Sequence, residues 1–185
     1  AGRMIDADTP EESCKTLLEC GYAPLESCTL EHVERVLSQA RAALYREVSV
    51  LAPDQRIVEI FQIKYDYHNA KLALKAKRSG EEVSRLAMDC GRFDAQKVLR
   101  GETSAVSAAM SRAMEQAEKE AGHSGDLRMA ELLLDRACYE EMSALANETG
   151  SAFLKDYVAL QIDAINLRTL VRAQRMGCED EILAA

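Results

Sequence analysis

The sequence predicts an all-α, multihelical protein in which tandem repeats of similar helical units contain long paired helices. Aromatic residues make up 5% of the chain and Trp is absent, whereas strands are enriched in aromatic and β-branched residues. Ala, Leu, Glu, Lys and Arg, which favour helices, are the dominant residues. Only three Pro residues interrupt the 185 positions, and apolar residues recur three or four positions apart, as on one face of a helix.

Capping and breaking residues divide the first part of the chain into three predicted helices. Residues 9–12 (TPEE) are a strong helix start, because Thr and Glu form a capping box around Pro in the first turn, and Gly21 ends this helix. Thr29 caps a second helix, which Pro53 ends. A third, long helix is predicted from Asp54 to about residue 78, where a Ser-Gly pair stops it.

The second part of the chain repeats this pattern with shorter pieces. Residues 81–90 are predicted to be helical up to Gly91, and a short helical turn follows at 93–99. An Ala/Met-rich helix is predicted over 104–121. Two more helices complete the chain, one capped by Asp126 and ended by Gly150, and one over 151–176 that stops at a Gly.

Two pairs of segments show an internal repeat. Residues 65–80 align with 162–177 at a shift of 97 positions, and residues 9–21 align with 79–91 at a shift of 70. Both members of the second pair end in Cys-Gly. The difference between the shifts predicts an insertion in the second unit, near residues 100–125.

The repeat predicts three segments: a first helical unit at 1–78, a second at 79–177 that carries the insertion, and the start of a truncated third unit at 178–185. Residues 179–181 resemble the acidic start of the earlier short helices, and the chain does not begin with Met. We therefore interpret the sequence as a fragment of a longer repeat protein.

An Asp and an Asn recur in the two long helices, as Asp66 and Asn69 in the first unit and Asp163 and Asn166 in the second. Residues three apart share one face of a helix. Buried polar side chains of this kind usually tie helices together by hydrogen bonds, since leaving them unpaired is costly. We interpret the four residues as a repeated structural motif, in preference to a ligand site.

A basic stripe also recurs in both units, and it has two interpretations. Its members are Lys71, Lys75, Arg78, Arg168, Arg172 and Arg175. Such a stripe is either a solvated face that pairs with local acidic residues or a docking face for an acidic partner. Its recurrence fits both, because a duplicated fold also repeats its structural salt bridges.

The sequence predicts no catalytic residues, no metal site and no cofactor. Its three His residues are scattered, and one E-x-x-H motif at Glu120 contains a Gly, which is unlike the paired motifs of di-iron bundles. No nucleotide-binding loop is present. The six Cys residues have no zinc-site spacing, so we expect reduced thiols and a cytoplasmic location.

Charge and hydropathy exclude two further classes of protein. The formal net charge is −8, which gives no general attraction to nucleic acid or to an anionic membrane surface. The longest run without a charged residue is nine residues, 103–111, whereas a transmembrane helix needs about 20 apolar residues. We expect neither nucleic-acid binding nor a transmembrane segment, and no signal peptide is visible.

The repeated motif closely resembles the signature of the C subunit of A/V-type rotary ATPases, which is called the d subunit in eukaryotes. The first copy covers residues 65–71 (YDYHNAK) and 74–77 (LKAK), and the second covers 163–173 (DAINLRTLVRA). The resemblance covers most of the chain and includes the order of the repeats.

This resemblance implies a socket of three similar helical domains on the cytoplasmic mouth of the membrane proteolipid ring. It implies that the socket receives the central-stalk subunits D and F and transmits torque during rotary proton or sodium-ion transport. Such a subunit binds no nucleotide and is not an enzyme by itself. It is peripheral to the membrane, through the ATPase complex. The present sequence departs from the family in length, with two units and the start of a third.

Two alternatives remain beside the resemblance. The first is a generic helical-repeat scaffold or adaptor without a rotary role. The second is a helical hydrolase or metal oxidase that uses Asp66, His68 and Glu120.

Overall fold

The computed structural model describes residues 2–125 and 127–177. These residues contain helices, turns and loops but no strand, which confirms the all-α prediction. The chain forms two compact units, residues 1–51 and residues 52–185, which are described separately below.

The N-terminal unit contains α1 (Gly2–Ile5), α2 (Pro10–Glu19) and α3 (Leu30–Leu51). The predicted cap of α2 is confirmed, because the Thr9 hydroxyl accepts a hydrogen bond from the Glu12 amide at 3.2 Å. Its apolar interior is small, since Leu17 and Val36 are its buried apolar residues. The Ser13 hydroxyl also donates to the Met4 carbonyl and links α1 to α2.

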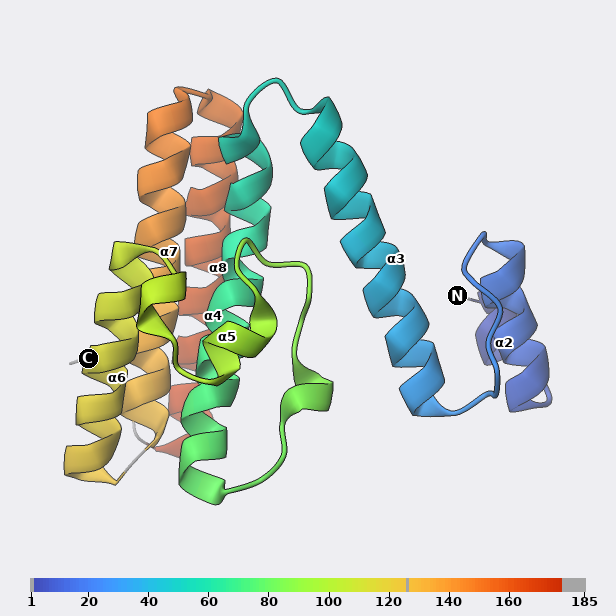
Figure 1. Cartoon of the computed structure of the whole chain (residues 1–185), viewed down its shortest axis with the longest axis horizontal. Coiled ribbons are helices and arrows are strands. Elements are labelled where there is room, and N and C mark those ends of the chain that lie inside the picture. Colours follow the sequence, from blue (N-terminus) through green and yellow to red (C-terminus); the bar gives the residue numbers. More distant parts are fainter. Residues whose placement is uncertain (1, 126, 178–185) are drawn as a thin grey trace. The chain divides into compact units, whose positions relative to one another are not determined.

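The second unit is a bundle of four long helices with α7 in contact with each of the others (Figure 1). Its helices are α4 (Gln55–Ser79), η1 (Ser84–Leu86), α5 (Ala95–Leu99), η2 (Thr103–Ala105), α6 (Ala108–Ser124), α7 (Leu127–Thr149) and α8 (Ala152–Met176). The long helices predicted from Asp54 and up to residue 176 are confirmed.

The core of this unit lies between α4, α6, α7 and α8. Ile60, Ile63 and Tyr67 on α4 belong to one buried cluster with Ala130 and Leu134 on α7. Small Ala side chains let the helix axes approach closely, and the larger side chains fill the remaining space. Burying one Ile or Leu side chain contributes about 2 kcal/mol, so this face largely fixes how α4 and α7 pack.

Two predictions about local structure are wrong. Residues 81–90 form no α-helix: they hold only the short 3₁₀ turn η1 and a loop. The reason is tertiary, because the backbone of Met88 bonds to the Asn69 side chain and not along a helix. The Ala/Met-rich helix begins at Ala108 and not at residue 104, since Ser107 caps it by accepting from the Met110 amide.

Some predictions stay untested. The cap at Asp126 and the third repeat segment at 178–185 lie outside the described residues. The repeat boundary at 78/79 comes from sequence similarity, whereas the compact units divide at 51/52. Compactness and sequence repetition are different properties, so the repeat units remain a prediction.

Candidate functional site

The Asn69 side chain fixes the loop that follows α4. Its amide nitrogen donates to the Met88 carbonyl at 2.9 Å, and its amide oxygen accepts from the Met88 N–H at 2.9 Å. The Asn side chain thus imitates the edge of a strand, because it pairs with both polar groups of one residue. Asn69 is fully buried, so these two bonds satisfy groups that would otherwise be desolvated without partners.

The Asp66 carboxylate holds the same loop one turn earlier on α4. Its Oδ1 atom accepts from the backbone N–H groups of Arg92 and Phe93, at 2.9 and 3.3 Å. Its Oδ2 atom pairs with the Arg92 Nε at 2.7 Å. A carboxylate that is 0% exposed is tolerated in a protein interior only with such pairing. Asp66 and Asn69 thus both bond to the loop after α4, and the repeated structural motif stays a prediction.

Gly91 lets the loop approach the Asp66 carboxylate. A Cβ atom at this position would lie 2.2 Å from Asp66 Oδ1 and 3.2 Å from its Cγ. Neither atom can move away easily, because the carboxylate is held by three donors. Gly is thus required here for close approach rather than for a turn, since Gly91 is not among the glycines with positive φ.

Arg92 links the loop to α7 as well as to α4. Its Nη1 donates to Glu141 Oε1 at 2.9 Å, and the Tyr67 hydroxyl donates to Glu141 Oε2 at 2.9 Å. The guanidinium also stacks on the Phe93 ring, 4.8 Å from its centroid. Two carboxylates and one guanidinium therefore share a largely buried network.

The ionisation behaviour of the network follows from this burial. Burial lowers the pKa of Arg92, but its bonds with Glu141 and Asp66 outweigh that effect and raise the pKa above its ordinary value. Burial, together with the charge of Glu141, also raises the pKa of Tyr67. Arg92 therefore stays charged and Tyr67 stays neutral. Burial also raises the pKa of the Asp66 carboxyl above its ordinary value, although its bonds with Arg92 and Phe93 act in the opposite direction. The network stiffens the contact between α4, the loop and α7.

Two further α4 residues contact the same loop. The Gln62 amide donates to the Cys90 and Gly91 carbonyls at 3.4 and 3.3 Å, and His68 Nε2 lies 3.2 Å from the Leu86 carbonyl oxygen. Sequence reasoning missed Arg92 and Glu141. Their partners lie 26 to 74 positions away in the chain, so no local periodicity could have revealed them.

The second copy of the Asp/Asn motif lies in a different environment. Asp163 and Asn166 on α8 are exposed, and neither makes a hydrogen bond or ion pair within the described part of the chain. The structure therefore does not bring the four motif residues together. A structural role for Asp163 and Asn166 remains a prediction.

The basic stripe divides into two parts. Lys71 and Lys75 form ion pairs with acidic residues of α7, namely Lys71 with Asp135 at 2.6 Å and Lys75 with Glu131 at 2.8 Å. These two ion pairs are what is expected of a solvated basic face that pairs with local acidic residues. The other members are the exposed residues Arg78, Arg168, Arg172 and Arg175. These arginines are the part of the stripe that a partner could contact.

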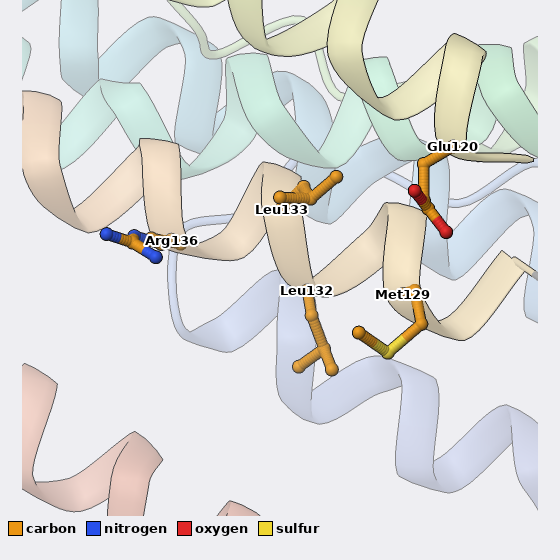
Figure 2. A pocket seen from close by; sticks show the side chains of 5 residues that line it. All are labelled: Glu120, Met129, Leu132, Leu133 and Arg136. Atoms are coloured by element: carbon orange, nitrogen blue, oxygen red, sulfur yellow. The ribbon is translucent and has the colours of Figure 1, made fainter. Parts of the chain in front are cut away.

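A shallow pocket of about 170 Å³ lies between α6 and α7 (Figure 2). Met129, Leu132 and Leu133 form its apolar wall, and Glu120 and Arg136 complete its lining. Glu120 thus lies in this pocket, whereas Asp66 and His68 both contact the loop after α4. The residues of the hypothetical hydrolase or oxidase are not gathered in one site. Within the described ranges, no three Asp, Glu, His or Cys residues are placed to hold a metal ion.

Comparison with known proteins assigns the family. The family model described as ATP synthase (C/AC39) subunit matches residues 2–185. The chain belongs to this family. The C/AC39 assignment agrees with the fold, since all described secondary structure is helical. No helix in the described ranges is long and apolar enough to cross a membrane.

Two curated relatives of this C/AC39 chain are named as C subunits of V-type complexes. The chain is 24% identical over 175 residues to the C subunit of the V-type sodium ATPase of Enterococcus hirae, an alignment that covers 92% of this chain and 53% of the relative. It is 26% identical over 162 residues to the C subunit of the V-type ATP synthase of Thermus thermophilus, with 80% of this chain and 49% of the relative covered. The chain thus spans about half the length of these curated relatives. No solved structure matches.

Proposed function

We propose that this chain is part of a non-catalytic subunit of a V-type rotary ATPase, which couples the central-stalk subunits D and F to the membrane proteolipid ring. The observation that carries the proposal is the C/AC39 family match over residues 2–185. The names of the relatives, both C subunits of V-type complexes, support the same role. The complex would carry out rotary proton or sodium-ion transport, with the chain on the cytoplasmic side and peripheral to the membrane.

The contacts of the second unit suit a part that transmits torque. A coupler must resist shear between its helices, and buried polar ties resist shear better than apolar contacts that can slide. Asp66, Asn69 and Arg92 tie α4 to the loop and to α7 in this way. In this proposed role, ATP hydrolysis would belong to other subunits of the complex, as the family resemblance implies.

We further propose that the exposed arginines of α8 form the docking face for an acidic surface of the stalk. Arg168, Arg172 and Arg175 lie on one side of this helix, because they step by four and three residues. Lys71 and Lys75 contribute less, since they already pair with Asp135 and Glu131. Exposed charges mainly affect the rate and salt dependence of association.

Calorimetric titration with the cognate D–F complex, at low and at moderate salt, tests both parts of the proposal. We expect binding that weakens with salt and that falls about tenfold at low salt when Arg168, Arg172 and Arg175 are changed to Glu. The matched control changes three other exposed basic residues, Arg112, Lys119 and Lys155, to Glu. This control variant changes the net charge by the same amount and should retain most of the affinity for the D–F complex.

Each outcome has a distinct meaning. Equal losses in the two triple variants would reject the docking face and keep the coupling role, because only net charge would then matter. Full-strength binding by both variants would reject the docking face in the same way. No binding by the unaltered chain, while the full-length family member binds, would show that the socket needs more than these residues. No binding by either would favour the scaffold alternative.

A further inference from the structure

The chain reverses its direction directly after α2, within the N-terminal unit. The Tyr22 amide donates to the Leu17 carbonyl at 3.2 Å, a bond that closes the last turn of this helix. Gly21, between the helix and Tyr22, has a left-handed conformation with φ of 88°. Figure 1 shows the following segment, residues 22–29, returning alongside α2 to the start of α3. The return brings a cysteine of this loop back to a cysteine of the helix.

The Cys28 thiol lies over one face of α2. It shares a hydrogen bond with the Cys14 thiol, and it also lies within reach of the charge of Glu11. Glu11 and Cys14 are three residues apart, so they share that face of the helix. The chain length permits the contact. From Cys14 to Cys20 the helix rises about 9 Å, and the eight residues from Gly21 to Cys28 can span up to about 26 Å.

The far end of the loop is held by α3. Glu26, two residues before Cys28, accepts a hydrogen bond from Arg35 at 3.1 Å. Thr29, the residue after Cys28, accepts from the His32 amide at 3.4 Å. Cys28 therefore lies between two residues that are anchored to the first turns of α3, and its thiol contacts α2. Both thiols of the pair are half-buried. Two reactive groups that separate elements hold in contact need little rearrangement to form a bond.

We propose that Cys14 and Cys28 are a reversible dithiol–disulfide pair, and that their oxidation by a small disulfide such as oxidised glutathione ties the start of α3 to α2. The N-terminal unit has a small apolar interior, with Leu17 and Val36 as its buried apolar residues. A cross-link restricts the open states of such a unit, so oxidation acts as a switch of its local stability. The proposal is independent of the role in a rotary ATPase.

The reaction is a thiol–disulfide exchange in two steps. The hydrogen bond with Cys14, together with burial, raises the pKa of Cys28 to about 11, so Cys28 keeps its proton and Cys14 reacts first. The Cys14 thiolate bonds to one sulfur of oxidised glutathione, breaks its S–S bond and releases one glutathione thiolate. Cys14 then carries no charge, and Cys28 loses its proton more easily.

In the second step, the Cys28 thiolate attacks the Cys14 sulfur of this mixed disulfide. The bond between the Cys14 sulfur and glutathione breaks, and a second glutathione thiolate leaves. The two cysteine thiols have then lost two electrons, which reduce one oxidised glutathione to two thiols. The two protons that the cysteines release pass to the two glutathione thiolates.

Disulfide mapping on the full 185-residue chain tests the pairing. The reduced protein is equilibrated with a series of ratios of reduced to oxidised glutathione, quenched with acid and alkylated. Cleavage after Lys and Glu residues places the three N-terminal cysteines on separate peptides, and mass spectrometry identifies which are linked. We expect at least about tenfold more Cys14–Cys28 disulfide than of either disulfide that contains Cys20, because only the first pair is held in contact.

The same chain in denaturing urea is the reference. Cys20 lies six positions from Cys14 and eight from Cys28, and shorter loops close more readily in an unfolded chain. The disulfides of Cys20 should therefore predominate in urea. A Cys14–Cys28 preference of equal size in urea would overturn the proposal. Disulfides of Cys20, mixed disulfides or links between chains as the main products of the folded protein would also overturn it, as would thiols that stay reduced at every ratio.

Amide hydrogen exchange measures the effect of the disulfide on stability. In the oxidised protein we expect the Tyr22 amide to exchange about tenfold more slowly than in the reduced protein, and dithiothreitol should restore the faster rate. Cys20→Ser, at an exposed thiol, is the control and should retain both the disulfide and the slower exchange. Cys14→Ser and Cys28→Ser should each lose both. A disulfide that forms without slowing this exchange would overturn the switch.

Discussion

At the residue scale, the loop after α4 depends on one position without a side chain. We expect Gly91→Ala to destabilise the protein by about 2 to 3 kcal/mol, because the new methyl group would displace the loop from the Asp66 carboxylate, 2.2 Å away. Urea unfolding measures the change.

The matched control for this prediction is Gly122→Ala. Gly122 lies within α6, and a Cβ atom added there would meet no heavy atom within 4 Å. Ala is the better helix former by about 1 kcal/mol, so this variant should be as stable as the parent or more stable. Equal destabilisation by both substitutions would contradict the close approach of Gly91 to Asp66.

A buried thiol predicts loss of stability at alkaline pH. Burial, with the charge of Asp135, raises the pKa of Cys138 from 9.0 to about 12. The unfolded chain releases this proton above pH 9 while the folded chain retains it, so the stability contribution is complete below pH 9 and is lost as the pH rises towards 12. By about pH 10.5 the loss is about 2 kcal/mol.

Cys138→Ala should remove this part of the pH dependence. The variant will be less stable at every pH because it leaves a small cavity, but its stability should fall less between about pH 8 and about pH 10.5. Cys20→Ala, at an exposed thiol, should retain the slope of the parent. Urea unfolding over this pH range provides the comparison, and parallel curves for all three proteins would refute the assignment.

At the element scale, Arg92 joins α4, the loop and α7. Arg92→Ala would leave the buried carboxylate of Asp66 and the largely buried one of Glu141 without their cation. We expect a loss of about 3 kcal/mol in the free energy of unfolding, as is usual when one partner of a buried ion pair is removed. Chemical unfolding measures it.

Arg136→Ala is the control for the arginine. Arg136 pairs with Glu140 on the surface of α7, where both side chains are about two-thirds exposed. Its removal should cost less than about 0.5 kcal/mol. Arg92→Lys should recover part of the loss, because Lys keeps the charge but cannot bridge both carboxylates with the same geometry. A small effect of Arg92→Ala would indicate that water replaces the guanidinium.

At the scale of the whole molecule, the compact units and the sequence repeats divide the chain at different places. The compact units meet at 51/52, and the repeat units at 78/79. We expect limited proteolysis to cut near residues 52–54 and to leave a resistant piece that contains residues 79–101 intact, because Asp66 and Asn69 hold the loop within that segment. A stable piece cut within 79–101 would instead support the repeat units as folding units.

Much of the helical architecture could be predicted from local signals. The caps at Thr9 and Asp54 and the stops at Gly80 and Gly177 depend on a few neighbouring residues, and the structure has them all. The Asp66–Asn69 tie could also be predicted, since buried polar residues must find partners. The family could be inferred from the repeated motif, and the match over residues 2–185 bears it out.

The sequence by itself determined where the long helices run and which family the chain belongs to, because periodicity, capping and motif spacing are properties of nearby residues. Only the tertiary structure decided that residues 81–90 form a bound loop, that Arg92 and Glu141 complete the network, and that the two copies of the motif differ in burial. These features depend on partners far apart in the chain. The same Asp and Asn are a buried tie in α4 and an open face in α8 because burial depends on what packs against a helix.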